Sequence, residues 1–108
     1  MKRGDIITIS APGDYGKPRP AVVIQSDRFL RTKSVLVCPM TTTEVASPLF
    51  RLLVAPLPET GLREMSYAMT EKLTPIQREK CGPVMGRLSD QALLDLDEML
   101  AVITGLAD

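Results

Sequence analysis

The 108-residue sequence contains no histidine and no tryptophan. Without an imidazole there is no Ser-His-Asp triad, no Cys-His dyad and no side chain whose unperturbed pKa lies near neutrality. The 2 cysteines, Cys38 and Cys81, are spaced neither as a CxxC redox motif nor as half of a zinc site. We therefore predict reduced, buried thiols, and any catalysis has to use other groups.

Long apolar runs are also missing. No apolar segment approaches the roughly 20 residues that cross a bilayer, and Met1–Ser10 lacks the apolar core of a signal peptide. We predict a cytoplasmic protein with no membrane partner. Residues 1–108 are predicted to form a single domain, since domains commonly run to roughly 100 to 150 residues.

The charge is neutral overall but uneven along the chain. The sequence has 13 Lys and Arg against 13 Asp and Glu, and residues 1–54 hold 8 of the basic and 4 of the acidic residues, giving 8 − 4 = +4. Residues 55–108 are therefore −4. Neutrality ordinarily argues against nucleic-acid binding, because Lys and Arg make most phosphate contacts. The basic half removes that objection.

Short β-branched and apolar runs dominate the chain. We predict strands at 5–10, 21–25, 34–40, 50–54, 66–71 and 81–87, and a helical turn over 73–79 with Thr74 as N-cap and Pro75 at N1. One helix begins after Ser89, buries Leu93, Leu96, Leu100 and Ile103, exposes Asp90, Asp95, Asp97 and Glu98, and stops at Gly105. The fold class is α+β, a small partly open barrel packed against a C-terminal helix.

Two segments are candidates for phosphate chemistry. Arg19 lies between Pro18 and Pro20, which restrict the chain around a guanidinium that can bind phosphate oxygens through two hydrogen bonds. Thr41 and Thr42 follow a predicted buried strand, where a hydroxyl can orient a phosphate. The simpler interpretations are an exposed loop arginine and a hydroxyl that caps a local turn.

Acidic and aromatic candidates are few. Asp14, beside Tyr15 and five positions before Arg19, can act as an acid or base, hold a guanidinium, or simply form a turn. Glu71 and Lys72 are interpreted first as a surface ion pair. The aromatic residues are too few for an extended stacking platform, so recognition of a single strand would rely on one or two rings: Tyr15, Phe29, Phe50 and Tyr67.

Three motifs resemble the MazF/PemK family of toxin endoribonucleases: Arg3-Gly-Asp-Ile-Ile, Arg19-Pro-Ala-Val-Val-Ile and Val35-Leu-Val-Cys-Pro-Met-Thr-Thr42. The resemblance continues through Ser66-Tyr67 to the closing helix and covers nearly the whole chain. It implies an SH3-like, CcdB/PemK-like barrel that forms a homodimer and cleaves single-stranded RNA without a metal or other cofactor. The products are a 2′,3′-cyclic phosphate and a 5′-hydroxyl.

The resemblance also implies residue roles. Arg19 and Thr41 match the catalytic arginine and threonine, and Asp14 matches a contributing acidic position although it is shorter than the usual Glu. Predicted RNA contacts are Tyr15, Lys17, Arg28, Thr42, Glu71 and Lys72, and we expect Arg28, Arg31 and Lys33 to surround Arg19. The implied partner is an antitoxin whose acidic, disordered tail folds into the groove that binds RNA.

Two alternatives stay open. A CcdB-like toxin binds DNA gyrase without catalysis, but such toxins end in Trp-Gly-Ile, whereas this chain ends Thr104-Gly-Leu-Ala-Asp108. The other is a toxin-like binding module that has lost its activity, against which the presence of Arg19 and Thr41 argues.

Overall fold

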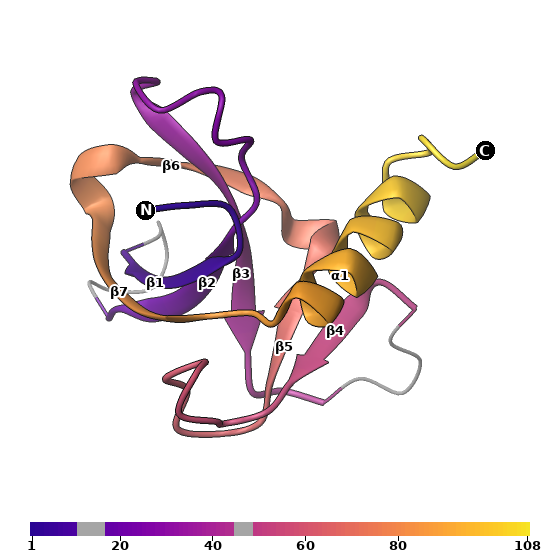
Figure 1. Ribbon diagram of the computed structural model, residues 1–108, viewed down its shortest axis with the longest axis horizontal. Helices are drawn as coiled ribbons and strands as arrows, with labels where there is room; N and C mark the ends of the chain where they lie inside the picture. Colours follow the sequence, from indigo (N-terminus) through magenta and orange to yellow (C-terminus); the bar gives the residue numbers. More distant parts are fainter. Residues whose placement is uncertain (11–16, 45–48) are drawn as a thin grey trace.

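The computed structural model describes residues 1–10, 17–44 and 49–108 (Figure 1). Its strands are β1 (Asp5–Ile9), β2 (Arg19–Val23), β3 (Ser34–Thr41), β4 (Arg51–Val54), β5 (Ser66–Met69), β6 (Thr74–Gln77) and β7 (Cys81–Arg87). The 3₁₀ turns η1 (Thr70–Lys72) and η2 (Arg78–Lys80) flank β6, and the helix α1 (Asp90–Ile103) ends the chain. No helix within the described part of the chain is long and apolar enough to cross a membrane.

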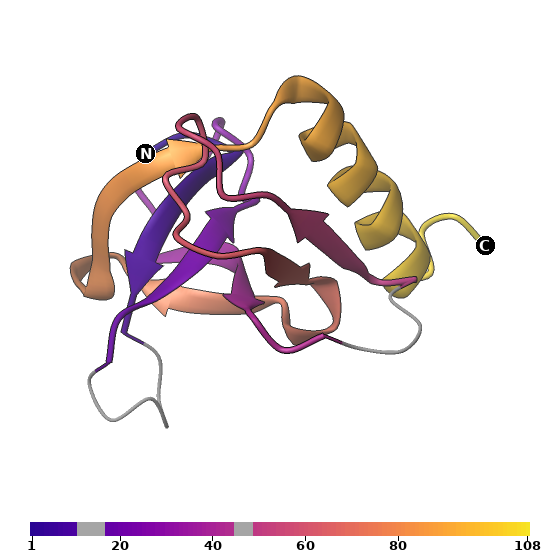
Figure 2. The same cartoon turned by 90° about the horizontal axis from the view of Figure 1, so that it is seen from below.

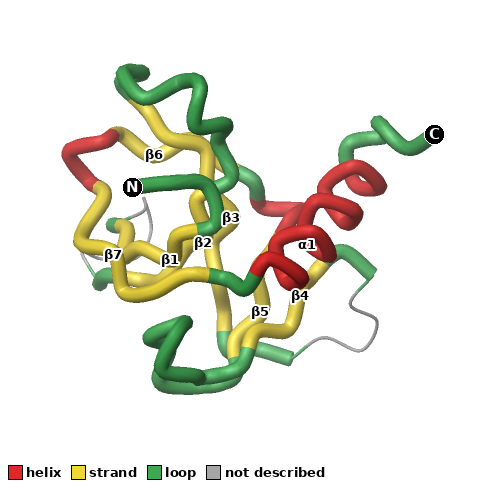
Figure 3. The backbone as a smooth tube through the Cα atoms, in the orientation of Figure 1, coloured by secondary structure: helices red, strands yellow, loops and turns green. Residues whose placement is uncertain are grey.

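The strand β3 is shared between two parts of one antiparallel sheet. The order is β4-β5-β3-β2-β1-β7, and β6 pairs with β3 off this path. Residues Ser34–Val37 of β3 pair with β6, whereas Met40 and Thr41 pair with β5. The chain thus curls into the partly open barrel predicted from the sequence, with α1 lying beside β4 (Figures 1 to 3).

Alternation along β2 and β3 creates two separate cores. Val22 and Cys38 belong to the cluster that contains Leu96 of α1, while their neighbours Ala21 and Val37 belong to the cluster inside the barrel. Successive side chains of a strand point to opposite faces, so one face of these strands meets the helix and the other lines the barrel. Both faces are therefore buried over most of their length.

The helix begins as predicted. The Ser89 Oγ accepts a hydrogen bond from the Ala92 amide at 3.1 Å, and Gly105 ends the helix with a φ of 80°. The predicted apolar stripe is wrong at its end, because Ile103 is 40% exposed while Leu96 is fully buried. Asp97 was predicted to be solvated, but it pairs with Arg3, whose Nε also donates to the Ile24 carbonyl.

The predicted helical turn over 73–79 is wrong. Residues Thr74–Gln77 form β6, with Pro75 opposite Leu36 of β3. Proline is tolerated on a strand whose far side has no pairing partner, because its missing amide costs no hydrogen bond there. The turn follows instead as η2. The buried-thiol prediction holds for Cys38 but fails for Cys81, which is partly exposed at the start of β7.

Candidate active site

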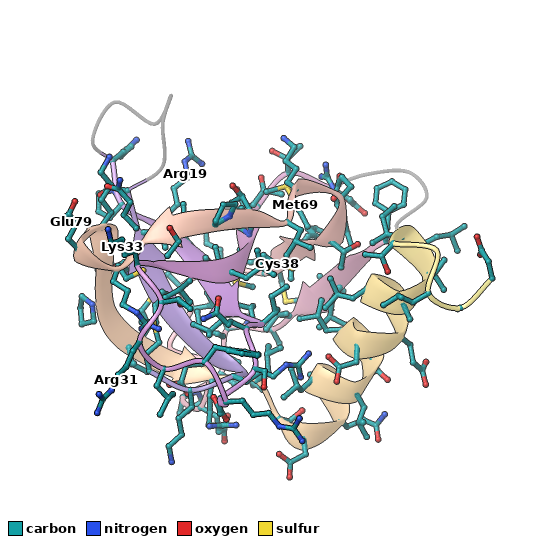
Figure 4. The ribbon with its side chains drawn as sticks, turned by 90° about the horizontal axis from the view of Figure 1, so that it is seen from above. Arg19, Arg31, Lys33, Cys38, Met69 and Glu79 are labelled. Carbon is teal, nitrogen blue, oxygen red and sulfur yellow. The ribbon has the colours of Figure 1, made fainter. Side chains whose placement is uncertain are left out.

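Arg19 is the first residue of β2 rather than part of the loop before it. The strand begins two residues earlier than predicted, and Arg19 lies opposite Ile9 of β1. Its backbone position is therefore fixed by the sheet. The side chain is exposed and projects from the side of the molecule on which Met69 also lies (Figure 4).

Thr41 is the last residue of β3, at the same end of the strand pair as Arg19. The β2–β3 ladder pairs Ala21 with Pro39, so the same register continued by two residues brings Arg19 opposite Thr41. Paired residues of neighbouring strands share a face, and the strands are about 4.8 Å apart. Arg19 and Thr41 thus lie at the same end of the two strands, each two positions beyond the last paired residues Ala21 and Pro39.

The surface becomes more open toward Thr41. On this face Val37 is fully buried, whereas Pro39 and Thr41, beyond the part of β3 that pairs with β6, are half-buried. The Thr41 Oγ1 accepts a hydrogen bond from the Thr43 amide at 3.2 Å, which is the local turn considered from the sequence. A hydroxyl that accepts one bond still has its own hydrogen to donate. Thr42, next along the chain, is exposed.

The pairing continues from Thr41 across two more strands. Tyr67 of β5 lies opposite Thr41, and Leu53 of β4 lies opposite Tyr67. We call Arg19, Thr41, Tyr67 and Leu53 the site row. The neighbouring positions Met40, Ala68 and Leu52 point the other way and are buried in the core beside α1.

Glu71 is bound by Arg51 and not by Lys72, so the predicted ion pair of Glu71 with Lys72 is wrong. Arg51 lies opposite Met69, two positions along the strands from the site row. Its Nε donates to Glu71 Oε2 at 2.8 Å, and its Nη2 lies 2.7 Å from the same oxygen. Lys72 is exposed at the end of η1.

The structure separates the remaining basic candidates. Lys17 is exposed two residues before Arg19, whereas Arg28, Arg31 and Lys33 follow β2 and lie at its far end. Arg31 is on the opposite side of the molecule from Arg19 (Figure 4). The prediction that Arg28, Arg31 and Lys33 surround Arg19 is therefore wrong. Asp14 and Tyr15 lie outside the described residues.

The cysteines supply no nucleophile to this face. Burial raises the pKa of the Cys38 thiol to about 12, against a smaller opposing effect of the Arg3 guanidinium. Burial also raises the pKa of the Cys81 thiol, and Arg78 again opposes the shift. Among the described residues, no group of three or more acidic or cysteine side chains is placed to hold a metal ion.

A hollow of about 600 Å³ adjoins the Leu53 end of the site row. Its lining combines the end of β4, the segment after it and the start of α1, and includes Leu57, Thr60, Arg87 and Asp90. Neither Arg19 nor Thr41 lines it. This hollow is therefore separate from Arg19 and Thr41.

Comparison with known proteins identifies the family of this chain. A family model of PemK-like, MazF-like toxins of type II toxin-antitoxin systems matches residues 2–104. The chain belongs to this family. It is also 44% identical over 108 residues to the probable endoribonuclease MazF of Mycolicibacterium smegmatis, and the match covers 99% of each chain.

Solved structures of MazF toxins have the same fold. The Mycobacterium tuberculosis toxin MazF-mt6 superposes with a TM-score of 0.81 at 20% identity, covering 94% of this chain and 96% of that one. An endoribonuclease in complex with its cognate antitoxin, from Mycobacterial species, gives a TM-score of 0.80 at 19% identity, covering 98% of this chain and 96% of that one. The partly open barrel with a C-terminal helix is thus the MazF-like fold.

Two residues of this face escaped sequence reasoning in this MazF-like toxin. From the sequence, Tyr67 is one of four aromatic residues and part of the family resemblance at Ser66-Tyr67, and no role is predicted for Arg51. Their signal is strand pairing, which brings Thr41 opposite Tyr67, 26 positions away, and Arg51 opposite Met69, close enough for an ion pair with Glu71, 20 positions away. A single sequence does not reveal which strands will be neighbours.

Proposed function

We propose that this MazF-like toxin is a sequence-specific, metal-independent endoribonuclease that cleaves single-stranded RNA. The observation that carries the proposal is the placement of Arg19 and Thr41 on one open face at the same end of β2 and β3. A permanently charged guanidinium beside a fixed hydroxyl suits a phosphodiester oxygen. The relative at 44% identity, named a probable endoribonuclease, supports the same activity.

The reaction is an internal transesterification. The ribose 2′-oxygen attacks the adjacent phosphorus, the bond from phosphorus to the 5′-oxygen breaks, and the products are a 2′,3′-cyclic phosphate and a 5′-hydroxyl. The 2′-hydroxyl proton passes to a base, and the departing 5′-oxygen gains a proton. Preorganised donors that stabilise charge on the phosphate are the main source of acceleration in such a site.

Each residue has one task in this scheme. Arg19 neutralises the phosphate and protonates or stabilises the departing 5′-oxygen, while Thr41 donates its hydroxyl to a phosphate oxygen. Asp14 or a polarised water takes the 2′-proton. The proposed RNA contacts are Tyr15, Lys17, Thr42, Glu71 and Lys72. Arg28, at the other end of β2 from Arg19, is proposed to contact RNA away from the scissile phosphate. DNA lacks the attacking 2′-hydroxyl, so it is not cleaved.

The biological consequence is inhibition of translation and growth by cleavage of cellular RNA in the cytoplasm. We propose that the toxin is a homodimer and that a cognate antitoxin neutralises it by laying an acidic, disordered tail over the RNA-binding groove. The solved complex of a similar endoribonuclease with its cognate antitoxin supports such a partner. RNA and the tail are then expected to compete, and both bind less tightly as salt rises.

One experiment tests the activity. The purified protein is incubated with a long unstructured RNA in EDTA, and the fragment ends are mapped beside an all-DNA strand of the same sequence. We expect cuts at a short motif with 5′-hydroxyl ends and intact DNA. We expect Arg19→Ala to reduce cleavage by about 100- to 1,000-fold, whereas the control Arg31→Ala, on the opposite side of the molecule, should cleave normally.

The same assay separates the alternatives. Intact RNA together with inhibited DNA gyrase favours the CcdB-like mode of action, and intact RNA with unaffected gyrase favours a binding module. A folded Arg19→Ala protein that cleaves RNA at the wild-type rate refutes the catalytic assignment.

A further inference from the structure

Tyr67 is an aromatic ring fixed directly beside Thr41. The β3–β5 ladder pairs Met40 with Ala68 and Thr41 with Tyr67, and the β4–β5 ladder pairs Leu53 with Tyr67. Side chains of directly opposed residues have Cβ atoms about 4.5–5.5 Å apart. Tyr67 is therefore the next side chain after Thr41 in the site row.

The burial pattern puts the ring on the open side of the sheet. Along β5, Ser66, Ala68 and Met69 are buried while Tyr67 is half-buried. Leu53, its partner on β4, is 51% exposed, and the flanking Leu52 and Ala68 lie in the core beside α1. A ring held between two paired strands and open to solvent is a rigid apolar surface beside a hydroxyl and a guanidinium.

The side chains of the site row follow the order of the parts of a nucleotide, with phosphate-binding groups first and an aromatic ring for the base next. Arg19 and Thr41 suit a phosphate, and an aromatic ring one strand further suits the face of a base. Phe29 lies in the segment after β2, beyond the end of the strand that is farther from Arg19. Phe50 precedes β4. Among the described residues, Tyr67 is thus the aromatic that the sheet brings next to the proposed catalytic pair.

We propose that Tyr67 is a substrate-positioning residue that stacks on the base adjoining the scissile phosphate. The proposal rests on the function proposed above and names the part of the substrate that this position recognises. Stacking is possible with every base, so Tyr67 contributes affinity and orientation, and any preference it adds follows stacking strength. Motif recognition by hydrogen bonds then belongs to other side chains.

The test separates contact with bases from contact with phosphates. Two uncleavable single strands are compared by fluorescence anisotropy: a deoxyadenosine decamer, and a decamer with the same sugars and phosphates but no bases. We expect Tyr67→Leu to weaken binding of the adenine strand by about 5- to 150-fold, the range of one base–aromatic stack, and to leave the abasic strand unchanged. Arg19→Ala is expected to weaken both.

Two variants control for folding and for general loss of an aromatic. Leucine preserves apolar bulk in β5, and Tyr67→Phe preserves the ring and is expected to bind like wild type. Phe29→Leu also replaces an aromatic ring by leucine, at an exposed position at the other end of β2, and no effect is expected. Thermal unfolding shows whether each variant is folded.

The outcomes distinguish this inference from the function on which it rests. Equal weakening of both strands by Tyr67→Leu, or no weakening of either, overturns the stacking role even if wild type cleaves RNA. Selective loss on the adenine strand supports it even if wild type proves unable to cleave. With active enzyme, Tyr67→Leu is also expected to raise KM for RNA by a similar factor while cleavage at saturation changes less.

Discussion

Two nitrogens of Arg51, Nε at 2.8 Å and Nη2 at 2.7 Å, contact the same carboxylate oxygen of Glu71. The side chains are only 12% and 24% exposed. Glu71 follows β5, and Arg51 shares the face of the site row, so the carboxylate charge is neutralised within the protein close to the proposed site. If RNA binds there as proposed, the pair lowers the repulsion between Glu71 and the RNA phosphates.

Removal of Arg51 should affect both stability and RNA binding. We expect Arg51→Met to lower the free energy of unfolding by about 1–3 kcal/mol, since it leaves a partly buried carboxylate without its partner. RNA binding should weaken because the Glu71 charge is exposed. The double variant Arg51→Met with Glu71→Gln should recover most of both. Urea unfolding and anisotropy measure the two effects, and additive losses in the double variant contradict this account.

Substitution of Arg19 should distinguish charge from geometry. Arg19→Ala is expected to reduce kcat by about 100- to 1,000-fold, the usual loss when one donor to a charged transition state is removed. Arg19→Lys retains the charge but not the two-pronged hydrogen bond, so its rate should fall between those of Ala and wild type. Single-turnover cleavage of a mapped RNA measures this. Equal rates for Lys and Ala would show that charge alone contributes nothing.

The hydroxyl of Thr41 should matter more than its methyl group. Thr41→Ser keeps a donor and an acceptor for the Thr43 amide, so activity should stay within a few-fold of wild type. Thr41→Val has nearly the same shape without the hydroxyl and should lose activity while remaining folded. Thr41→Val that cleaves as fast as Thr41→Ser would remove the hydroxyl from the mechanism.

The two thiols should differ in reactivity and in their effect on stability at high pH. The folded-state pKa of Cys38 is raised from 9.0 to about 12, so the folded state holds this proton more tightly than the unfolded state. The stabilising contribution is present below pH 9 and declines as pH rises from 9 toward 12. We expect Cys38→Ala to lose less stability than wild type across that window, measured by urea unfolding.

Thiol labelling provides an independent check at one pH. At pH 8 the partly exposed Cys81 should react first with a disulfide reagent, and the buried Cys38 should react only after denaturant is added. Rapid reaction of both thiols in the native protein would contradict the burial of Cys38.

The sequence predicted most elements because β-branched runs and a capped helix are local signals. It failed at Thr74–Gln77, where Thr-Pro looks like a helix start but the segment is recruited as a strand by the edge of β3. The sequence also predicted that Arg28, Arg31 and Lys33 surround Arg19, because they are near it in the chain. They lie instead beyond the other end of β2. The strand register places Thr41 opposite Tyr67 and brings Arg51 within reach of Glu71, and local sequence patterns do not encode this pairing.

The pairing of β3 with both β5 and β6 has a consequence for the chain while it is being synthesised. The strand ends at Thr41, but its neighbours β5 and β6 lie between Ser66 and Gln77. While the ribosome makes the chain, Arg19 and Thr41 emerge long before the strands that hold Thr41 and supply Tyr67. A chain released before Gln77 therefore lacks part of the pairing of β3, and we expect the proposed site to be incomplete in it.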